Sequence, residues 1–156
     1  GSHTFTAEEI VAFAAAYDPQ PFHVDPEAAK TSLFGSLCAS GWHTASIWMR
    51  LMVTFEQRRT AAMVARGEPL ARSGPSPGFK AMRWLKPVFP GDTITYAETV
   101  TGKQDLKSRP DWGLVLFTCT GHDQNGTLVF RFEGSVLYDR RTPAATVPPL
   151  ERRRKP

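Results

Sequence analysis

The chain has 156 residues, of which 41% are hydrophobic and 22% are charged. This composition is typical of a single globular domain with its own core, and it excludes a wholly disordered chain. The net charge of +4 comes largely from the carboxyl-terminal ERRRKP and from Arg140 and Arg141, so a general nucleic-acid-binding surface is not expected.

The two cysteines, Cys38 and Cys119, have neither the number nor the spacing of a disulfide framework or a metal site. Reduced thiols of this kind favour a cytoplasmic location. The apolar runs fall short of the roughly 20 residues that a membrane-spanning helix needs, and no signal peptide is recognisable. The four histidines lack the spacing of metal ligands, so we expect neither a bound metal nor contact with a membrane.

The first predicted helix begins after Thr6, which forms a capping-box pattern with Glu9. Apolar residues follow at helical spacing as far as Tyr17. Pro19 disfavours helical geometry at the residue before it, so we expect this helix to end at Asp18.

Two further helices are predicted before the middle of the chain. A short one begins with Asp25 as N-cap and Pro26 at its first position. The longest helical pattern begins near Gly41 and is closed by Gly67. It is rich in Trp, Met and Ala, which favours a helix wrapped by other structure.

The second half of the chain changes to strand-like runs separated by turn signals. These runs cover residues 79–88, 92–104, 112–124 and 127–140. Asn125 and Gly126 predict a hairpin turn of type I′, in which both residues take positive φ. Four strands with short links predict an antiparallel sheet, and with the long helix this is an α+β fold. We expect one domain over residues 1–141 and an extended Pro/Arg-rich arm over 142–156.

An acid and an imidazole stand close together after the first predicted helix. Asp18 and His23 are separated by PQPF, and Pro19 and Pro21 fix φ at two points of that loop. A carboxylate beside an imidazole orients it and raises its basicity, and together they hold a water. The alternative is structural: Asp18 ends a helix, and His23 is a loop residue that bonds to the backbone.

The start of the long helix is a second candidate site. Unpaired N–H groups at Gly41 would stabilise negative charge, as in an oxyanion hole. The simpler interpretation makes Ser40 the N-cap and gives Gly41 a role in close packing. His43, in the first turn, is more typical of a packed or surface residue than of a base.

Three segments in this order, YDPQPFHVDPEAAK, LFGSLCASGWHTASIWMRL and RWLKPVFPGDTITYAETV, resemble the MaoC-like dehydratases, which include the (R)-specific enoyl-CoA hydratases. The resemblance covers roughly residues 5–139. It implies a hotdog fold, in which an antiparallel sheet wraps a long central helix. It also implies a homodimer, or a dimer of dimers, in which the sheets join.

The resemblance also implies an activity and its residues. Family members add water to an enoyl-CoA or remove it from an (R)-3-hydroxyacyl-CoA, so an acyl-CoA would be the substrate and no cofactor is expected. The catalytic aspartate and histidine fall on Asp18 and His23, and a supporting serine, which would orient Asp18, falls on Ser46. The oxyanion contact comes from the backbone near Gly41 and Trp42.

Two positions depart from the family's pattern, since this chain has Gln20 where asparagine is usual and Ser40 where histidine is frequent. The acyl chain is therefore not fixed by the resemblance. Three other functions stay open: a hotdog thioesterase, a non-catalytic acyl-CoA-binding protein and an oligomerisation module. Release of free thiol would distinguish the thioesterase from a hydratase.

Overall fold

A computed structural model describes residues 1–141, so the predicted arm at 142–156 lies outside the described residues. Five strands form one antiparallel sheet in the order β1-β3-β4-β5-β2. They are β1 (Ser2–Thr4), β2 (Gly78–Trp84), β3 (Thr93–Asp105), β4 (Trp112–His122) and β5 (Leu128–Asp139). The helices are α1 (Ala7–Tyr17), α2 (Pro21–Val24), α3 (Pro26–Lys30) and α4 (Gly41–Ala65).

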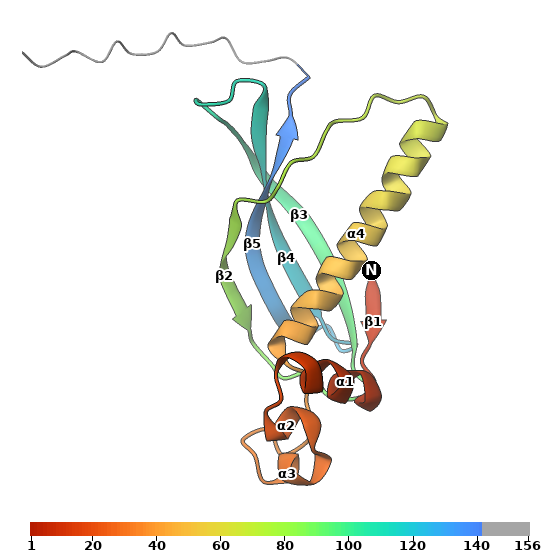
Figure 1. Cartoon of the computed structure of the whole chain (residues 1–156), viewed down its shortest axis with the longest axis vertical. Coiled ribbons are helices and arrows are strands. Elements are labelled where there is room, and N and C mark those ends of the chain that lie inside the picture. The colour runs from red at the N-terminus through yellow and green to blue at the C-terminus, as the bar shows by residue number, and fades with distance from the viewer. Residues whose placement is uncertain (142–156) are drawn as a thin grey trace, which may run out of the picture.

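The helix α4 lies along one face of the twisted sheet, and α1, α2 and α3 gather at the end where α4 begins (Figure 1). The α+β hotdog fold is confirmed. Although β2 and β3 are consecutive in the chain, they are not neighbours in the sheet. The strand β2 lies at the sheet edge beside β5, and β3 lies between β1 and β4. The segment that joins them therefore crosses the end of the sheet, next to the first turn of α4.

The helix boundaries follow local chemistry. Thr6 Oγ1 accepts from the Glu9 N–H at 3.2 Å, and the Glu9 carboxylate accepts from the Thr6 N–H at 3.3 Å. This confirms the predicted capping box. Asp18 is the C-cap of α1, and its backbone N–H donates to the Ala14 carbonyl. Its φ of −154° is no longer helical, just before Pro19. Asp25 caps α3, as predicted.

Some details differ from the sequence predictions. The four-residue α2 was not expected, and its N-cap, Gln20, makes no capping hydrogen bond through its side chain. The strand β1 was not expected either, because three residues carry too little pattern. In the turn after β4, Gly126 has φ +81° and Asn125 does not have positive φ. The type I′ prediction is therefore wrong, and Asp123 instead closes a longer turn by accepting from two backbone N–H groups.

The core lies between the sheet and the first two turns of α4. The buried residues of this helix are His43, Thr44, Ala45 and Ile47. Farther along, Phe55 is 63% exposed and Val64 is 60% exposed, so the sheet covers mainly the first half of the helix. None of the helices within residues 1–141 combines the length and apolar character needed to cross a bilayer.

Candidate active site

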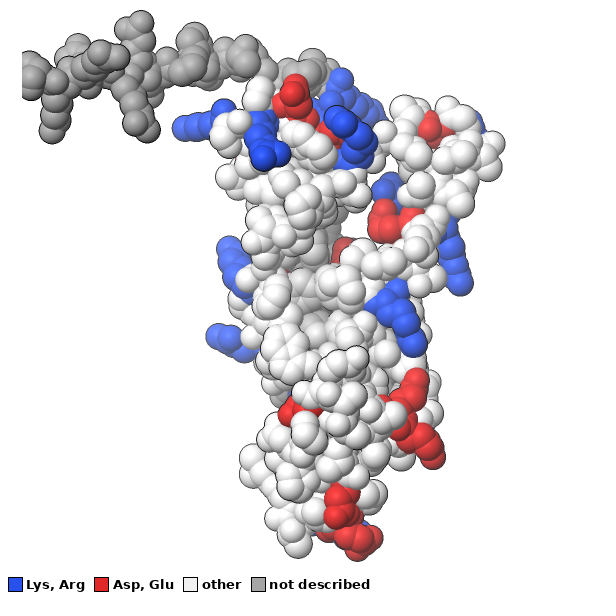
Figure 2. All heavy atoms as spheres, viewed as in Figure 1, with Lys and Arg blue, Asp and Glu red and all other residues white. Residues whose placement is uncertain are grey.

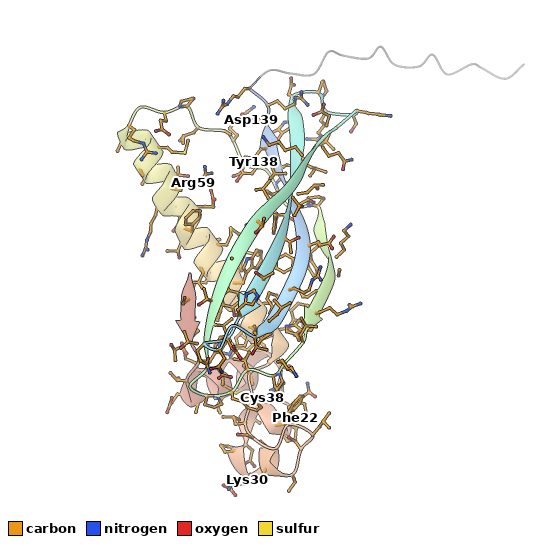
Figure 3. The ribbon with its side chains drawn as sticks, turned by 180° about the vertical axis from the view of Figure 1, so that it is seen from behind. Phe22, Lys30, Cys38, Arg59, Tyr138 and Asp139 are labelled. Carbon is orange, nitrogen blue, oxygen red and sulfur yellow. The ribbon has the colours of Figure 1, made fainter. Side chains whose placement is uncertain are left out.

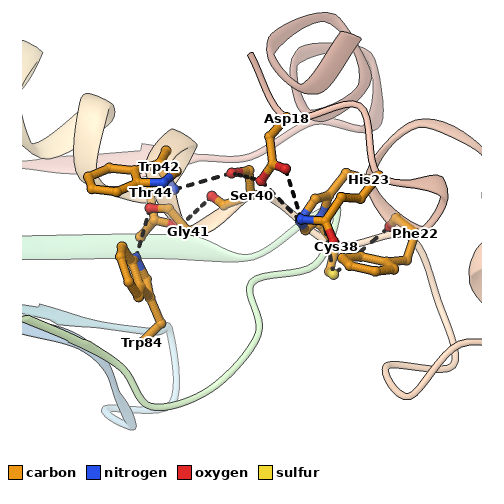
Figure 4. A network of polar contacts seen from close by, with 10 residues as sticks. Asp18, Phe22, His23, Cys38, Ser40, Gly41, Trp42, Thr44 and Trp84 are labelled. Atoms are coloured by element: carbon orange, nitrogen blue, oxygen red, sulfur yellow. Dashed lines mark hydrogen bonds and ion pairs between the residues drawn. The ribbon is translucent and has the colours of Figure 1, made fainter.

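The structure brings Asp18 and His23 together at the end of the molecule where α4 begins (Figure 4). Asp18 caps the end of α1, and His23 lies on α2, which Pro21 starts at its first position. His23 Nε2 lies 3.6 Å from Asp18 Oδ2, with the side chains 7% and 21% exposed. The bend between α1 and α2 therefore holds the Asp18 carboxylate and the His23 imidazole side by side, with both side chains mostly buried.

The tautomer of His23 is set by a backbone carbonyl. Its Nδ1 lies 2.6 Å from the oxygen of Cys38. A carbonyl only accepts hydrogen bonds, so Nδ1 carries the proton and donates it. In the neutral imidazole, Nε2 then has a free lone pair, and that lone pair faces Asp18.

The carboxylate of Asp18 is held by two donors. Ser40 Oγ donates to Oδ2 at 2.7 Å, and Gln20 Nε2 donates to Oδ1 at 2.8 Å. The hydrogen bond from Ser40, then that from Gln20 and last the nearby His23 lower the pKa of Asp18, against the opposing effect of burial. Asp18 is therefore ionised at neutral pH and accepts hydrogen bonds only.

Two acceptors thus face each other across 3.6 Å, a carboxylate oxygen and an imidazole lone pair. A gap of this length is longer than a direct hydrogen bond. A water molecule has two protons and meets both acceptors, so the arrangement suits the binding and deprotonation of one water.

The amino-terminal turn of α4 adjoins this pair through Ser40. Ser40 is fully buried, and as N-cap its Oγ accepts from the Trp42 N–H at 3.2 Å while it donates to Asp18. The backbone N–H of Trp42 is therefore already engaged, which corrects its expected oxyanion contact. Among residues 1–141, no hydrogen bond from the Gly41 N–H is formed. Of the two expected oxyanion donors, the Gly41 N–H is therefore the one that is not already engaged.

Ser46 does not take the supporting position expected of it. Its Oγ donates to the His43 carbonyl at 2.8 Å, within α4. Six residues separate it from Ser40, which is about one and two-thirds helical turns, so the two serines point to different sides. Ser40 bonds to Asp18 in its place. The sequence showed Ser40 as a cap, but it gave no sign that the same hydroxyl reaches the aspartate.

A groove of about 1340 Å³ runs between α4 and the sheet, and the space-filling view shows it as a hollow (Figure 2). Its near end is formed by Tyr17, Trp42 and Ser46. Asp18 and His23 do not line it, although Tyr17 directly precedes Asp18. The walls are mainly apolar: they include Phe13, Ala45, Met49, Met52, Val53, Phe79, Met82, Phe117, Phe132 and Val136.

The groove becomes more polar away from the site. Glu98 accepts from the Trp48 indole at 2.9 Å, and burial raises the pKa of Glu98. Tyr138 also lines this part. Figure 3 shows Tyr138 and Cys38 near opposite ends of the molecule. The part of the groove near α4's first turn therefore suits an apolar chain, and the part near Glu98 and Tyr138 suits a more polar group.

Nucleophilic and metal chemistry have little support in the described residues. Burial raises the pKa of the Cys38 thiol to about 11 and that of the Cys119 thiol to about 12. Both thiols are therefore protonated at neutral pH and poor nucleophiles. Within residues 1–141, no group of three or more His, Cys, Asp or Glu side chains is placed to hold a metal ion.

Comparison with known proteins identifies the family. A family model described as the MaoC like domain matches residues 2–112. The chain belongs to the MaoC-like family. A MaoC-like dehydratase from Rhodospirillum rubrum has a similar structure, with 37% identity, a TM-score of 0.71 and coverage of 91% of this chain and 89% of that chain.

Two further similar proteins have names that state an activity. The (R)-hydratase from A. caviae, involved in PHA biosynthesis, is 26% identical with a TM-score of 0.60, over 87% of this chain and 89% of that one. Mesaconyl-CoA hydratase from Cereibacter sphaeroides is 38% identical over 78 residues, which are 47% of this chain and 22% of that protein. The resemblance seen in the sequence is thus confirmed, and the chain is a MaoC-like protein of a hydratase and dehydratase family.

Proposed function

We propose that this MaoC-like protein is an enoyl-CoA hydratase, which in reverse dehydrates an (R)-3-hydroxyacyl-CoA. The observation that carries the proposal is the 3.6 Å approach of Asp18 Oδ2 to the Nε2 of His23, which has a free lone pair in the neutral imidazole. Both groups accept hydrogen bonds, and they meet beside the amino terminus of α4. This is the arrangement that water addition to a polarised double bond requires.

In the hydration direction, Asp18 and His23 accept hydrogen bonds from one water. The oxygen of that water forms a bond to Cβ of the enoyl thioester while one of its protons passes to the pair. The electrons of the double bond move towards the thioester oxygen. Cα then takes a proton from the pair, so one water is added in full and the protein is restored without any oxidation or reduction.

The negative charge on the thioester oxygen needs a donor. The Gly41 N–H supplies it at the positive end of α4. In other enzymes the loss of one such donor costs roughly 3–4 kcal/mol of barrier lowering. The contribution of Gly41 is therefore expected to be comparable with that of the acid–base pair.

The acyl chain occupies the groove in this proposal. Its walls near α4's first turn are apolar, and its volume of about 1340 Å³ exceeds what a short acyl chain fills. A CoA thioester agrees with the mesaconyl-CoA hydratase relative, whose name includes this carrier.

A homodimer, or a dimer of dimers, is part of the proposal. The strand β2 lies at the sheet edge, and Phe79 on it is 58% exposed. Phe55 and Val64 on α4 are also exposed, and a second copy would cover these apolar surfaces. Analytical ultracentrifugation would detect it, and a strictly monomeric protein at micromolar concentration would contradict this part.

The test follows the enoyl absorbance of crotonyl-CoA, and of longer and branched enoyl-CoAs, with the purified protein. We expect the absorbance to fall without release of free thiol, because a hydratase leaves the thioester intact. Release of thiol at the same rate would identify a thioesterase. Tight binding of acyl-CoA without turnover of any substrate would identify a non-catalytic binding protein.

A further inference from the structure

Trp84, the last residue of β2, touches the first turn of α4. Its indole Nε1 donates to the Gly41 carbonyl at 2.8 Å. A methyl group added at Gly41 would lie 2.7 Å from the indole ring, so the ring packs directly on this glycine. The hydrogen bond and the packing together fix the peptide that joins Gly41 to Trp42.

That peptide is one step in a continuous series of hydrogen bonds (Figure 4). Its carbonyl accepts from Trp84, and its N–H, on Trp42, donates to Ser40 Oγ at 3.2 Å. Ser40 Oγ in turn donates to Asp18 Oδ2 at 2.7 Å. Each donor in such a series is strengthened when its own group accepts a further hydrogen bond.

The sheet gives this series a rigid starting point. Trp84 pairs in the ladder with Phe130, which is fully buried, and the next backbone N–H, that of Leu85, bonds to Val129 at 2.8 Å. Trp84 itself is 43% exposed, and its ring makes an edge contact with Trp42 at 5.5 Å. The burial of its own side chain therefore does not by itself account for its position.

We propose that Trp84 is a positioning residue for Asp18, which acts through the first peptide of α4 and through Ser40. The expected effect on kcat rests on the proposed function, whereas the expected effect on the titration of Asp18 does not. Three side chains face Asp18: Ser40 from the cap of α4, Gln20 from the same loop and His23 from α2. Of these three, His23 is the titratable group. Trp84 thus links the sheet edge to the water-binding pair.

The test replaces Trp84 by Phe, which keeps a ring and removes the N–H donor. The matched control is Trp112→Phe, at the other end of the sheet, where the ring contacts Arg72. Titration of the Asp18 carboxyl carbon by NMR needs no substrate. We expect its midpoint to rise by about 0.1–0.7 pH unit in Trp84→Phe and to stay in place in Trp112→Phe, since cooperative strengthening is roughly 10–30% per bond.

Kinetics supply the second readout. We expect kcat for crotonyl-CoA hydration to fall about 1.3- to 5-fold in Trp84→Phe, the fold-change that corresponds to a shift of about 0.1–0.7 pH unit, with KM changed less than about twofold. In a Ser40→Ala background the same substitution should have little further effect, because the series is already broken. Full additivity of the two substitutions, or a rise in KM alone, would overturn the proposal.

Two further controls keep the result decisive. If Trp84→Phe does not fold, benzothienylalanine at position 84 keeps the bicyclic shape and lacks only the N–H. An unchanged Asp18 titration in that variant would overturn the inference. A shifted titration in a protein without hydratase activity would instead refute the proposed function and leave the role of Trp84 standing.

Discussion

The two buried histidines near the start of α4 have opposite surroundings. His23 donates from Nδ1 to a backbone carbonyl and faces Asp18 with Nε2. His43 stacks on Phe13 at 4.5 Å, and its Nδ1 is buried without a hydrogen bond within residues 1–141. Burial lowers the pKa of His43 to about 4.

Burial alone therefore does not make a histidine functional. Both residues are almost inaccessible to solvent, at 6% exposure for His23 and 4% for His43. Of the two, only His23 has a partner on each nitrogen. The Cys38 carbonyl fixes its tautomer, and Asp18 lies beside its Nε2. His43 is held by aromatic packing and stays neutral, so it serves the core.

Asp18→Asn should have the largest effect, because it removes the carboxylate that makes the His23 region distinct. Loss of one acid–base group lowers kcat about 10²–10⁴-fold. The thermal melting temperature should change little, since asparagine has nearly the same shape. Stopped assays with crotonyl-CoA measure the loss. Asp111→Asn, at the far end of the sheet before β4, is the control and should retain full activity.

His43→Phe tests the other region through stability and pH. Between pH 6.5 and about 4 the unfolded chain binds a proton at position 43 and the folded chain does not. Stability is therefore present above this window and is lost as pH falls through it, by up to about 3 kcal/mol. Charges on Glu9, His3 and Arg50 also act on this ring.

The phenylalanine variant should show a shallower loss of stability between pH 7 and pH 4.5, measured by urea unfolding. An identical pH slope in His43→Phe would contradict the assignment of His43 as a neutral core residue.

Ser40→Ala sharpens the description of the His23 region. The hydrogen bond from Ser40 is the largest cause that lowers the pKa of Asp18. Its removal should lower kcat about 10- to 100-fold, the effect of one hydrogen bond to a charged group. The acidic limb of the pH–rate profile should move to higher pH, because Asp18 then protonates more readily.

Ser46→Ala is the matched comparison, since Ser46 bonds to His43 and not to Asp18. It should leave the acidic limb where it is. If the limb moves in Ser46→Ala and not in Ser40→Ala, the supporting serine is the one that the resemblance implied.

Gly41→Ala tests the packing of Trp84 on the first turn of α4 through a modest loss of stability. Its methyl group would lie 2.7 Å from the Trp84 ring. The half-exposed ring has some freedom to move, so we expect a loss of about 1–2 kcal/mol, in the range of overpacked sites. Gly102→Ala is the control, because its methyl group would make an ordinary 3.6 Å contact with Leu116. Equal melting temperatures for the two variants would contradict the close packing at Gly41.

The sequence predicts those parts of the fold that depend on neighbours in the chain. Both predicted ends of α1 are confirmed. The helix begins after the capping box of Thr6 with Glu9, and it ends at Asp18, before Pro19. The approach of Asp18 to His23 could also be predicted, since only the loop PQPF separates them. The pairing of β2 with β5 could not, because it depends on which edge of the sheet is free.

The same limit explains the errors at the site. Ser40 lies 22 positions after Asp18, and no local pattern shows that its hydroxyl reaches that carboxylate. Trp42 was expected to offer its N–H to substrate, but the N-cap hydroxyl takes it. Both facts follow from how α1 and α2 pack against the start of α4, which is a property of the tertiary fold.

A crystal structure with a non-reactive acyl-CoA analogue would show directly where the thioester binds. We expect the thioester oxygen within hydrogen-bond distance of the Gly41 N–H. We expect Cβ beside a water held by Asp18 Oδ2 and His23 Nε2. An analogue bound with its thioester away from α4's first turn, or a direct Asp18–His23 hydrogen bond that leaves no place for water, would contradict the proposed mechanism.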